Sequence, residues 1–487
     1  MSQELQLPKS WVLATNNDLG EFINGFAFKP TDRSENGTPI IRIQNLTDPL
    51  RPFNYTVKNV DQKYVVELGD ILVSWSATLD AFRWDGPRAY VNQHIFKVVP
   101  SKQLNDRFVF FSLKESINEL TKSEHLHGTT MKHVNRKPFL AHPVGLPPLN
   151  EQHRIVEKIE TLFAHIDKGE EALREVQKLL KRYRQSILKA AVTGELTRDW
   201  REANQHKLKP ASDLLARILE TRRKNWEGRG EYKEPVKPDL SGLADLPIGW
   251  TWATFDQLFE VLGGATPSRR EPDYWGGKIR WVSSGEVAFC RIKETAQHIT
   301  QAGYESCSTK VHPEGTVLVA MIGEGKTRGQ AAILDTPACN NQNAAAIRVS
   351  ESGIEPEFVY YFLMGRYEQS RREGQGGNQP ALNGKKVKAF AMPLPSIAEM
   401  KEIVFQIEEA FSIAEAVEVT CQSELARSMS LRQSILKSAF TGQLVTQDPD
   451  DEPANELLAR IRAEREATPT KKQSKKKITR RKAQAKA

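Results

Sequence analysis

The sequence contains an internal repeat that spans most of its length, and this repeat constrains the fold more than any other feature. Leu7–Gly25 and Leu246–Gly264, at an offset of 239, share eight identical positions. Further along, Arg184–Leu196 matches Arg432–Leu444, at an offset of 248, at ten of thirteen positions. The pentapeptide Leu-Leu-Ala-Arg-Ile then follows in both copies. Ordered matches of this kind indicate a tandem duplication, in which each half is a mixed region followed by a long helix.

The mixed regions predict short strands separated by Gly, Pro, Asn and Asp. The strands are expected at 39–43, 69–73, 94–99, 278–282, 315–319 and 344–349. Helical patterns interrupt them at 107–120 and 357–371. Because helices and strands are interspersed, we predict the fold class α+β for each mixed region.

The helical regions carry a coiled-coil pattern, in which apolar residues recur at alternating spacings of four and three. In the first copy the predicted seam consists of Ile155, Ile159, Leu162, Ile166, Leu173, Val176, Leu180 and Ile187, and the same spacing also includes Gly169 and Tyr183. In the second copy it consists of Ile403, Ile407, Ala410, Ala414, Val417, Cys421, Leu431 and Ile435. A helix with one apolar stripe must bury it, and the other copy is the obvious partner. We therefore predict two long helices packed as an antiparallel coiled coil with pseudo-two-fold symmetry.

The duplication also predicts the domain boundaries. We expect a first mixed domain at 1–148, a first helical region at 149–228, a linker at 229–245, a second mixed domain at 246–395, a second helical region at 396–466, and a basic disordered tail at 467–487. The net charge of +8 comes largely from that tail, because Lys471–Ala487 holds nine Lys or Arg and no acid, and 8 − 9 = −1. The basic charge is therefore mostly a property of the tail and does not by itself indicate that the rest of the chain binds nucleic acid.

Composition excludes several classes of protein. Four scattered cysteines without a CxxC pair argue against a disulfide framework and a thiolate metal site. The longest apolar run, Val317–Ile322, is too short to cross a bilayer, and the sequence begins without a secretory signal. We therefore expect a cytoplasmic protein.

Three motifs imitate catalytic sites. Ala320–Thr327 fits a loose phosphate-loop pattern, but an apolar strand follows where a helix is needed, so a hairpin is the better interpretation. Asp273 and Glu324 are far apart for carboxylates that must share one Mg²⁺ ion. The histidines around His125 have no supporting Cys or carboxylate cluster. The Asn- or Asp-Pro-Pro-aromatic tetrapeptide of DNA adenine methyltransferases does not occur. We predict a chain without a catalytic site, metal or cofactor.

These repeats resemble the specificity (S) subunits of type I restriction-modification systems. A Leu-Pro-x-Gly-Trp motif typically opens each target-recognition domain of that family, and Leu246–Trp250 fits it, whereas Leu7–Trp11 has Ser10 in place of Gly. The junction Pro147–Gln152 resembles the family's entry into the long helix, while Pro395–Met400 departs at two positions. The helix ends resemble the family's recurring Ser-Ile-Leu…Gly-x-Leu. The resemblance extends over about residues 5 to 466.

The resemblance implies a non-catalytic subunit that gives a larger complex its DNA sequence specificity. Each target-recognition domain would read one half of an asymmetric, bipartite site on double-stranded DNA, and the helices would set the spacer. Two modification (methyltransferase) subunits would dock on the helical regions, and restriction/translocase subunits would join them. S-adenosylmethionine, ATP and Mg²⁺ would be used by those partners.

Base recognition needs Arg, Lys, Asn or Gln on protruding loops, with aromatic side chains beside them. On this ground the predicted DNA contacts of the first domain are Trp75, Arg83, Trp84, Arg88, Lys132 and His133. Those of the second domain are Arg269, Arg270, Lys326, Arg328, Asn378 and Gln379. Two other classes of protein stay open at this point: a structural coiled-coil protein with protein-binding heads, and an enzyme such as a fused nuclease-methyltransferase or an ATPase.

Overall fold

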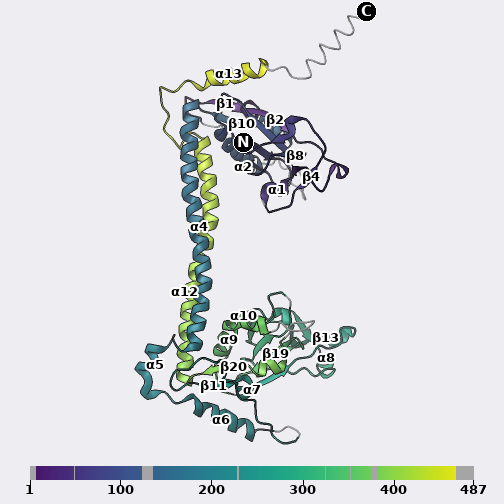
Figure 1. Ribbon diagram of the computed structural model, residues 1–487, viewed down its shortest axis with the longest axis vertical. Helices are drawn as coiled ribbons and strands as arrows, with labels where there is room; N and C mark the ends of the chain where they lie inside the picture. Colours follow the sequence, from purple (N-terminus) through teal and green to yellow (C-terminus); the bar gives the residue numbers. More distant parts are fainter. Residues whose placement is uncertain are drawn as a thin grey trace, which may run out of the picture. The chain divides into compact units, whose positions relative to one another are not determined.

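The structure is a computed structural model that describes residues 7–48, 50–122, 135–226, 230–323, 325–350, 352–373 and 382–467. The chain divides into two compact units, of which unit 1 comprises Met1–Leu173 with Gln422–Ala487 and unit 2 comprises Arg174–Cys421. Two long helices, α4 (Leu149–Thr193) and α12 (Ile397–Phe440), each contribute to both units (Figure 1). Each unit therefore contains one mixed domain and one end of each long helix.

The mixed domain of unit 1 is built on two four-stranded sheets. The first has the order β2 (Gly20–Asn24), β9 (Ile95–Pro100), β6 (Ile71–Ser74) and β7 (Asp80–Arg83). The second has the order β4 (Asn54–Thr56), β3 (Thr38–Ile41), β8 (Ala89–Val91) and β5 (Val65–Val66). A separate antiparallel pair joins β1 (Val12–Thr15) to β10 (Pro143–Leu146). The helices are α1 (Ile43–Thr47), α2 (Asp106–Lys122), α3 (Arg136–Ala141) and α13 (Ala454–Ala467).

The mixed domain of unit 2 repeats this plan with a larger sheet. Its five strands are β12 (Glu260–Gly263), β19 (Ala344–Arg348), β16 (Val317–Ala320), β17 (Ala331–Leu334) and β14 (Cys290–Ile292), in that order. A second sheet has the order β15 (Gln297–Ile299), β13 (Trp275–Val282) and β18 (Cys339–Asn340), and β11 (Thr251–Thr254) pairs with β20 (Ala391–Leu394). The helices are α5 (Arg198–Asn204), α6 (Ala211–Lys224), α7 (Phe255–Leu258), α8 (Gln301–Glu305), α9 (Pro356–Gly365), α10 (Tyr367–Glu373) and α11 (Gly384–Lys388).

The predicted strands and the α+β class are confirmed, with boundaries that differ by up to three residues. The predicted helix at 107–120 is α2, whereas the one at 357–371 is broken at Arg366 into α9 and α10. The segment 320–327, which fits the loose phosphate-loop pattern, leads from β16 into β17. These strands pair antiparallel, so the predicted hairpin is confirmed. The four residues of β16 are all buried, as expected for a strand inside the sheet.

The ends of the two long helices pack on each other in opposite directions. In unit 1, Ile155 and Ile159 near the start of α4 share a core with Ile435 and Phe440 at the end of α12. In unit 2, the end of α4 at Leu188 shares a core with Ile403 and Ile407 at the start of α12. Burial of these apolar positions provides the main stabilisation of each helix pair, because long isolated helices gain little from propensity alone.

The predicted seam is wrong at two of its apolar members, Val417 and Leu431, and at Gly169 and Tyr183 of the same spacing. Leu431 is 49% exposed, Tyr183 42% and Val417 37%, and Gly169 is exposed as well. The side chain one position further along faces the partner helix in each case: Glu170, Arg184, Glu418 and Arg432. Leu173, Val176 and Leu180 between these positions are half-buried as predicted, so the departure is confined to places where a charged side chain bridges the two helices.

The shifted positions form ion pairs between the helices. In unit 2 the Nη1 atom of Arg184 lies 2.8 Å from Oε2 of Glu418. In unit 1 the Nη2 atom of Arg432 lies 3.2 Å from Oε1 of Glu170, and its guanidinium lies over the ring of Phe163. Both partners of the first pair are offset by 248 from those of the second, so the two pairs are equivalent under the duplication. Polar residues in a seam fix the register of the helices.

Candidate nucleic-acid interface

The repeated motifs meet at the base of the mixed domain in unit 2. Glu399, in the first turn of α12, is 1% exposed and accepts three hydrogen bonds. The donors are Nε1 of Trp250 at 2.8 Å, Oγ1 of Thr197 at 2.8 Å and Nε of Arg201 at 2.7 Å. Trp250 belongs to the motif that opens the domain, whereas Thr197 and Arg201 follow the end of α4. One buried carboxylate therefore joins the domain to both long helices.

Glycine permits the close approach at this joint. Gly194 ends α4 with φ of +74°, and a Cβ there would lie 2.4 Å from Cγ of Pro247. In unit 1 the equivalent Gly442 has φ of +73°, and its Cβ would lie 2.2 Å from Cγ of Pro8. A positive φ and a steric limit both require glycine here. The sequence repeats thus encode a joint that fixes how each domain is attached.

The joint of unit 1 has weaker polar contacts. Glu151, the equivalent of Glu399, is fully buried and accepts a hydrogen bond from Nε2 of Gln447 at 3.1 Å. Its other oxygen has no hydrogen-bond partner among the described residues. Burial raises the pKa of the Glu151 carboxyl above its ordinary value. The nearby Arg154 instead pairs with Asp451 at 2.7 Å, and this contact lowers the pKa of Asp451.

The structure changes the set of predicted contacts in the first domain. Trp84 is 4% exposed and donates its indole N–H to the carbonyl oxygen of Pro87 at 2.8 Å, so it packs in the core; as a DNA contact it stays a prediction. Trp75 is half-buried, with its ring 4.8 Å from that of His94. Arg83 donates to the carbonyl oxygen of Gly69.

Among the arginines of this domain, Arg88 remains well placed for an interface. It is exposed and pairs with the exposed Glu67 at 3.3 Å, a contact that solvent screens and a phosphate can replace. Arg83 pairs instead with Asp106 at 3.6 Å and is only half-exposed. Lys132 and His133 lie outside the described residues.

In the second domain Arg269 lines a hollow of about 380 Å³, and the next residue, Arg270, is exposed. The guanidinium of Arg269 lies 4.3 Å from the ring centroid of Trp275 and donates to Oε1 of Gln297 at 2.9 Å. His298 also lines the hollow. Cation–π stacking holds the arginine in place while part of its donor fork remains available. This arrangement of an ordered arginine, an amide and an aromatic face can contact base edges and phosphates.

An irregularity in the sheet creates this hollow. The pairing of β13 with β15 shifts register between Trp275 and Ile279. Gly276 has φ of +79°, and a Cβ on Gly277 would lie 2.4 Å from the carbonyl oxygen of Ile299. Such bulges redirect a side chain at the edge of a sheet. Trp275, Gln297 and His298 were missed by the sequence reasoning, although the Trp-Gly-Gly sequence five residues after Arg270 is a usable signal.

The other predicted contacts of the second domain divide into two groups. Lys326 is exposed in the connection between β16 and β17. Arg328 is 6% exposed and donates to the carbonyl oxygen of Arg371 at 3.2 Å, so it supports this connection from inside; as a DNA contact it stays a prediction. Asn378 and Gln379 lie outside the described residues.

Among the residues that the structure describes, no group of three or more His, Cys, Asp or Glu side chains is arranged to hold a metal ion. Within the same ranges, no helix has the length and apolar content needed to span a bilayer.

The family model for the type I restriction modification DNA specificity domain matches residues 8–177 and 247–415. Similar proteins include the EcoBI specificity subunit of Escherichia coli, 28% identical over 503 residues that cover 97% of this chain and 96% of that protein. The EcoDI specificity subunit of Escherichia coli is 26% identical over 439 residues, which cover 88% of this chain and 91% of that protein.

Solved structures agree on the fold. A chain from a type I restriction-modification system, determined to explain complex assembly and conformational transition, aligns with a TM-score of 0.62 at 18% identity, covering 90% of this chain and 99% of the other. The HsdS subunit from Thermoanaerobacter tengcongensis aligns with a TM-score of 0.52 at 16% identity, with the same coverage. Because the family model matches both mixed domains and together more than half of the chain, the protein belongs to the family of type I restriction-modification specificity subunits.

Proposed function

We propose that this chain is the non-catalytic subunit that gives a type I restriction-modification complex its DNA sequence specificity. The observation that supports this most directly is the double match of the specificity-domain model, once for each mixed domain. The two domains have the same plan but different surface residues, so each is assigned a different half of an asymmetric, bipartite site. Inverted copies of one fold are suited to half-sites of opposite orientation.

We assign base and backbone contacts to exposed residues of each domain. In the second domain these are Arg269 at the hollow, the exposed Arg270 that follows it, and Lys326 on the β16–β17 connection. In the first domain these are the exposed Arg88 and the half-buried Trp75 and Arg83. Lys132, His133, Asn378 and Gln379 stay predictions. Each good side-chain contact to a base contributes about 1–3 kcal/mol of discrimination.

The helical regions at 149–228 and 396–466 are assigned two roles, as the spacer between the half-sites and as the docking surface for two modification subunits. Restriction subunits complete the complex. Methyl transfer with S-adenosylmethionine and ATP-driven translocation belong to those partners, so the chain acts where cellular DNA lies, in the cytoplasm. The interhelical ion pairs support the spacer role, because a spacer needs a fixed register.

A domain exchange tests this function. Residues 7–145 are replaced by the corresponding domain of another family member, and N6-methyladenine is mapped by single-molecule sequencing in cells that express the modification subunit. The proposal is supported if the methylated sequence motif disappears when the gene is deleted, and if the chain with the exchanged domain methylates a motif in which only one half-site is altered. Methylation that is unaffected by deletion, or a hybrid in which both half-sites change, contradicts it.

A further inference from the structure

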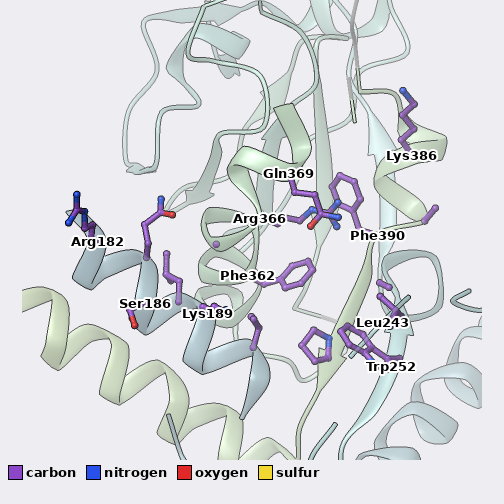
Figure 2. A pocket seen from close by; sticks show the side chains of 17 residues that line it. Arg182, Ser186, Lys189, Leu243, Trp252, Phe362, Arg366, Gln369, Lys386 and Phe390 are labelled. Atoms are coloured by element: carbon purple, nitrogen blue, oxygen red, sulfur yellow. The ribbon is translucent and has the colours of Figure 1, made fainter. Parts of the chain in front are cut away.

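A cleft in unit 2 is not used by the proposed DNA contacts. It has a volume of about 1010 Å³ and lies between the end of α4 and the mixed domain (Figure 2). One wall is the exposed surface of α4 with Arg182, Ser186 and Lys189, and the opposite wall is formed by α9, α10 and β20. It is lined by residues of this unit alone.

The cleft combines positive charge with apolar walls. Arg182, Lys189, Arg366 and Lys386 line it, and none of the described lining residues is Asp or Glu. Arg182 and Lys189 form no ion pair within the described ranges and are exposed. Arg366 is held 3.6 Å from the ring centroid of Phe390.

The apolar part of the lining includes the half-buried ring of Trp252 and the side chain of Phe362 (Figure 2). Val192 of α4 also lines the cleft. A surface of this composition suits a chain that carries carboxylates next to an apolar side chain.

Unit 1 has the equivalent position, and there the cleft is closed. Four residues of α2, Ser112, Glu115, Ser116 and Glu119, line a gap of only about 20 Å³. At an offset of 250 they correspond to Phe362, Gly365, Arg366 and Gln369 of unit 2. At these four positions unit 1 has two glutamates and two serines, whereas unit 2 has one cation, Arg366, together with Phe362, Gly365 and Gln369.

Two substitutions open the space beside α4 in unit 2, although Phe362 and Arg366 are larger than Ser112 and Ser116. Glu115 is 5% exposed, whereas the equivalent Gly365 has no side chain to fill the space beside Leu188. Phe440 lines the gap of unit 1, where the equivalent residue of unit 2 is the smaller Val192. The open cleft is thus a specific property of the second copy.

From this asymmetry we infer that the cleft of unit 2 is a docking site for an acidic segment of a modification subunit, with an aromatic or aliphatic side chain seated against Trp252 and Phe362. The inference rests on the proposed function, which assigns subunit docking to the long helices. The cleft is continuous with α4, and its concave apolar walls favour a peptide over the convex backbone of a DNA duplex. The two identical modification subunits then bind to different surfaces of this chain, and the subunit bound to unit 2 is held more tightly.

Charge reversal on α4 tests the inference in the complete complex. The variant Arg182→Glu/Lys189→Glu changes two exposed cations of the cleft, and Lys181→Glu/Lys209→Glu changes two exposed lysines of the same unit outside it. Native mass spectrometry follows the titration of each full-length chain with modification subunits. We expect one of the two copies to bind at least tenfold more weakly to the cleft variant, with the control unchanged.

Filling the cleft provides an independent variant. Gly365→Glu introduces the residue of unit 1, and Gly365→Ala is its control, because a Cβ at this position makes only ordinary contact with Cβ of Leu188 at 3.4 Å. The Glu variant is expected to reproduce the loss of one copy, whereas the Ala variant retains both. Assembly of both cleft variants with unchanged affinity for both copies overturns the inference.

The same samples separate the remaining outcomes. If Arg182 and Lys189 contact DNA phosphates instead of a peptide, the cleft variant changes how DNA binding depends on salt. Loss of two phosphate contacts lowers the slope of log K against log salt by about 2. A lower salt slope in a cleft variant that still binds both modification subunits normally would show that the cleft contacts DNA and not a peptide, and would overturn the inference. If the unaltered chain binds no modification subunit, the proposed function itself fails, which differs from a variant that assembles normally.

Discussion

The buried carboxylates Glu399 and Glu151 occupy equivalent positions, yet their replacement by Gln is expected to have opposite consequences. In unit 2, Glu399→Gln removes the charge that Arg201 needs, and the Arg201 side chain is only 15% exposed. Removal of one partner from a buried ion pair costs 3–5 kcal/mol in general. Because the amide oxygen of Gln still accepts one hydrogen bond, we expect a loss of about 3 kcal/mol.

In unit 1, Glu151→Gln removes a charge that burial disfavours. The pKa of Glu151 is raised above 4.5, so the folded state binds the proton more tightly than the unfolded state does. Its contribution to stability is therefore fully present below pH 4.5 and declines as the pH rises through the raised value. At pH 7 the variant is expected to be within about 1 kcal/mol of the original or more stable, and to lack this decline.

Hydrogen exchange measured by mass spectrometry resolves the two units in one sample. At pH 7 the amides of β11 and β20 are expected to exchange about 100-fold faster in Glu399→Gln, because 1.4 kcal/mol corresponds to a factor of ten. The amides of β1 and β10 are expected to keep their rates in Glu151→Gln. Equal losses in both units would refute the reasoning, since the two carboxylates would then share one role despite their different partners.

Three further predictions concern the helix seam, a buried histidine and the DNA hollow. Leu431→Asp is expected to change unfolding in urea by less than about 1 kcal/mol, whereas Ile159→Asp costs several kcal/mol; similar losses would contradict the shifted seam. Burial lowers the pKa of His312 to about 4 from 6.5, so stability of unit 2 present above pH 6.5 is lost as the pH falls toward 4, by up to about 3 kcal/mol. His312→Gln should remove this dependence between pH 7.5 and 5, and an unchanged pH profile would show that His312 is not its source. Arg269→Ala should weaken binding by about 1–3 kcal/mol and relax specificity in one half-site only, as footprinting can show; equal effects on both half-sites would exclude a local contact.

The sequence was sufficient for the architecture because its signals are periodic and repeated. Duplicated motifs, strand-length apolar runs and a long apolar stripe each recur in both halves, so an error in one copy is corrected by the other. The structure also shows why these motifs are repeated: Trp250, Glu399 and Gly194 come from three separate segments and meet in one joint. Meetings of this kind depend on the tertiary fold, and no local pattern predicts them.

The candidate contacts were less predictable, because exposure is not encoded in residue type. Trp84 and Arg328 have the composition of DNA contacts but are buried, each with a hydrogen bond to a backbone carbonyl group. Trp275 is half-buried and stacks with Arg269 only because a bulge turns it toward the hollow. Whether an arginine faces solvent or the core is determined by the sheet around it, and the sequence gives only the candidates.

The ion pairs of the seam determine how the spacer can change during evolution. Arg184 with Glu418, and Arg432 with Glu170, are related by the duplication, so each unit has its own polar contact that fixes the register of the two helices. An insertion in α4 alone moves Arg184 relative to Glu170 along the same helix, and α12 cannot then satisfy both contacts. Insertions that preserve both pairs have to add whole helical repeats to α4 and α12 together. The spacer is therefore a property of two matched helices, whereas specificity changes within a single domain, which is attached through a joint that the rest of the chain leaves unaltered.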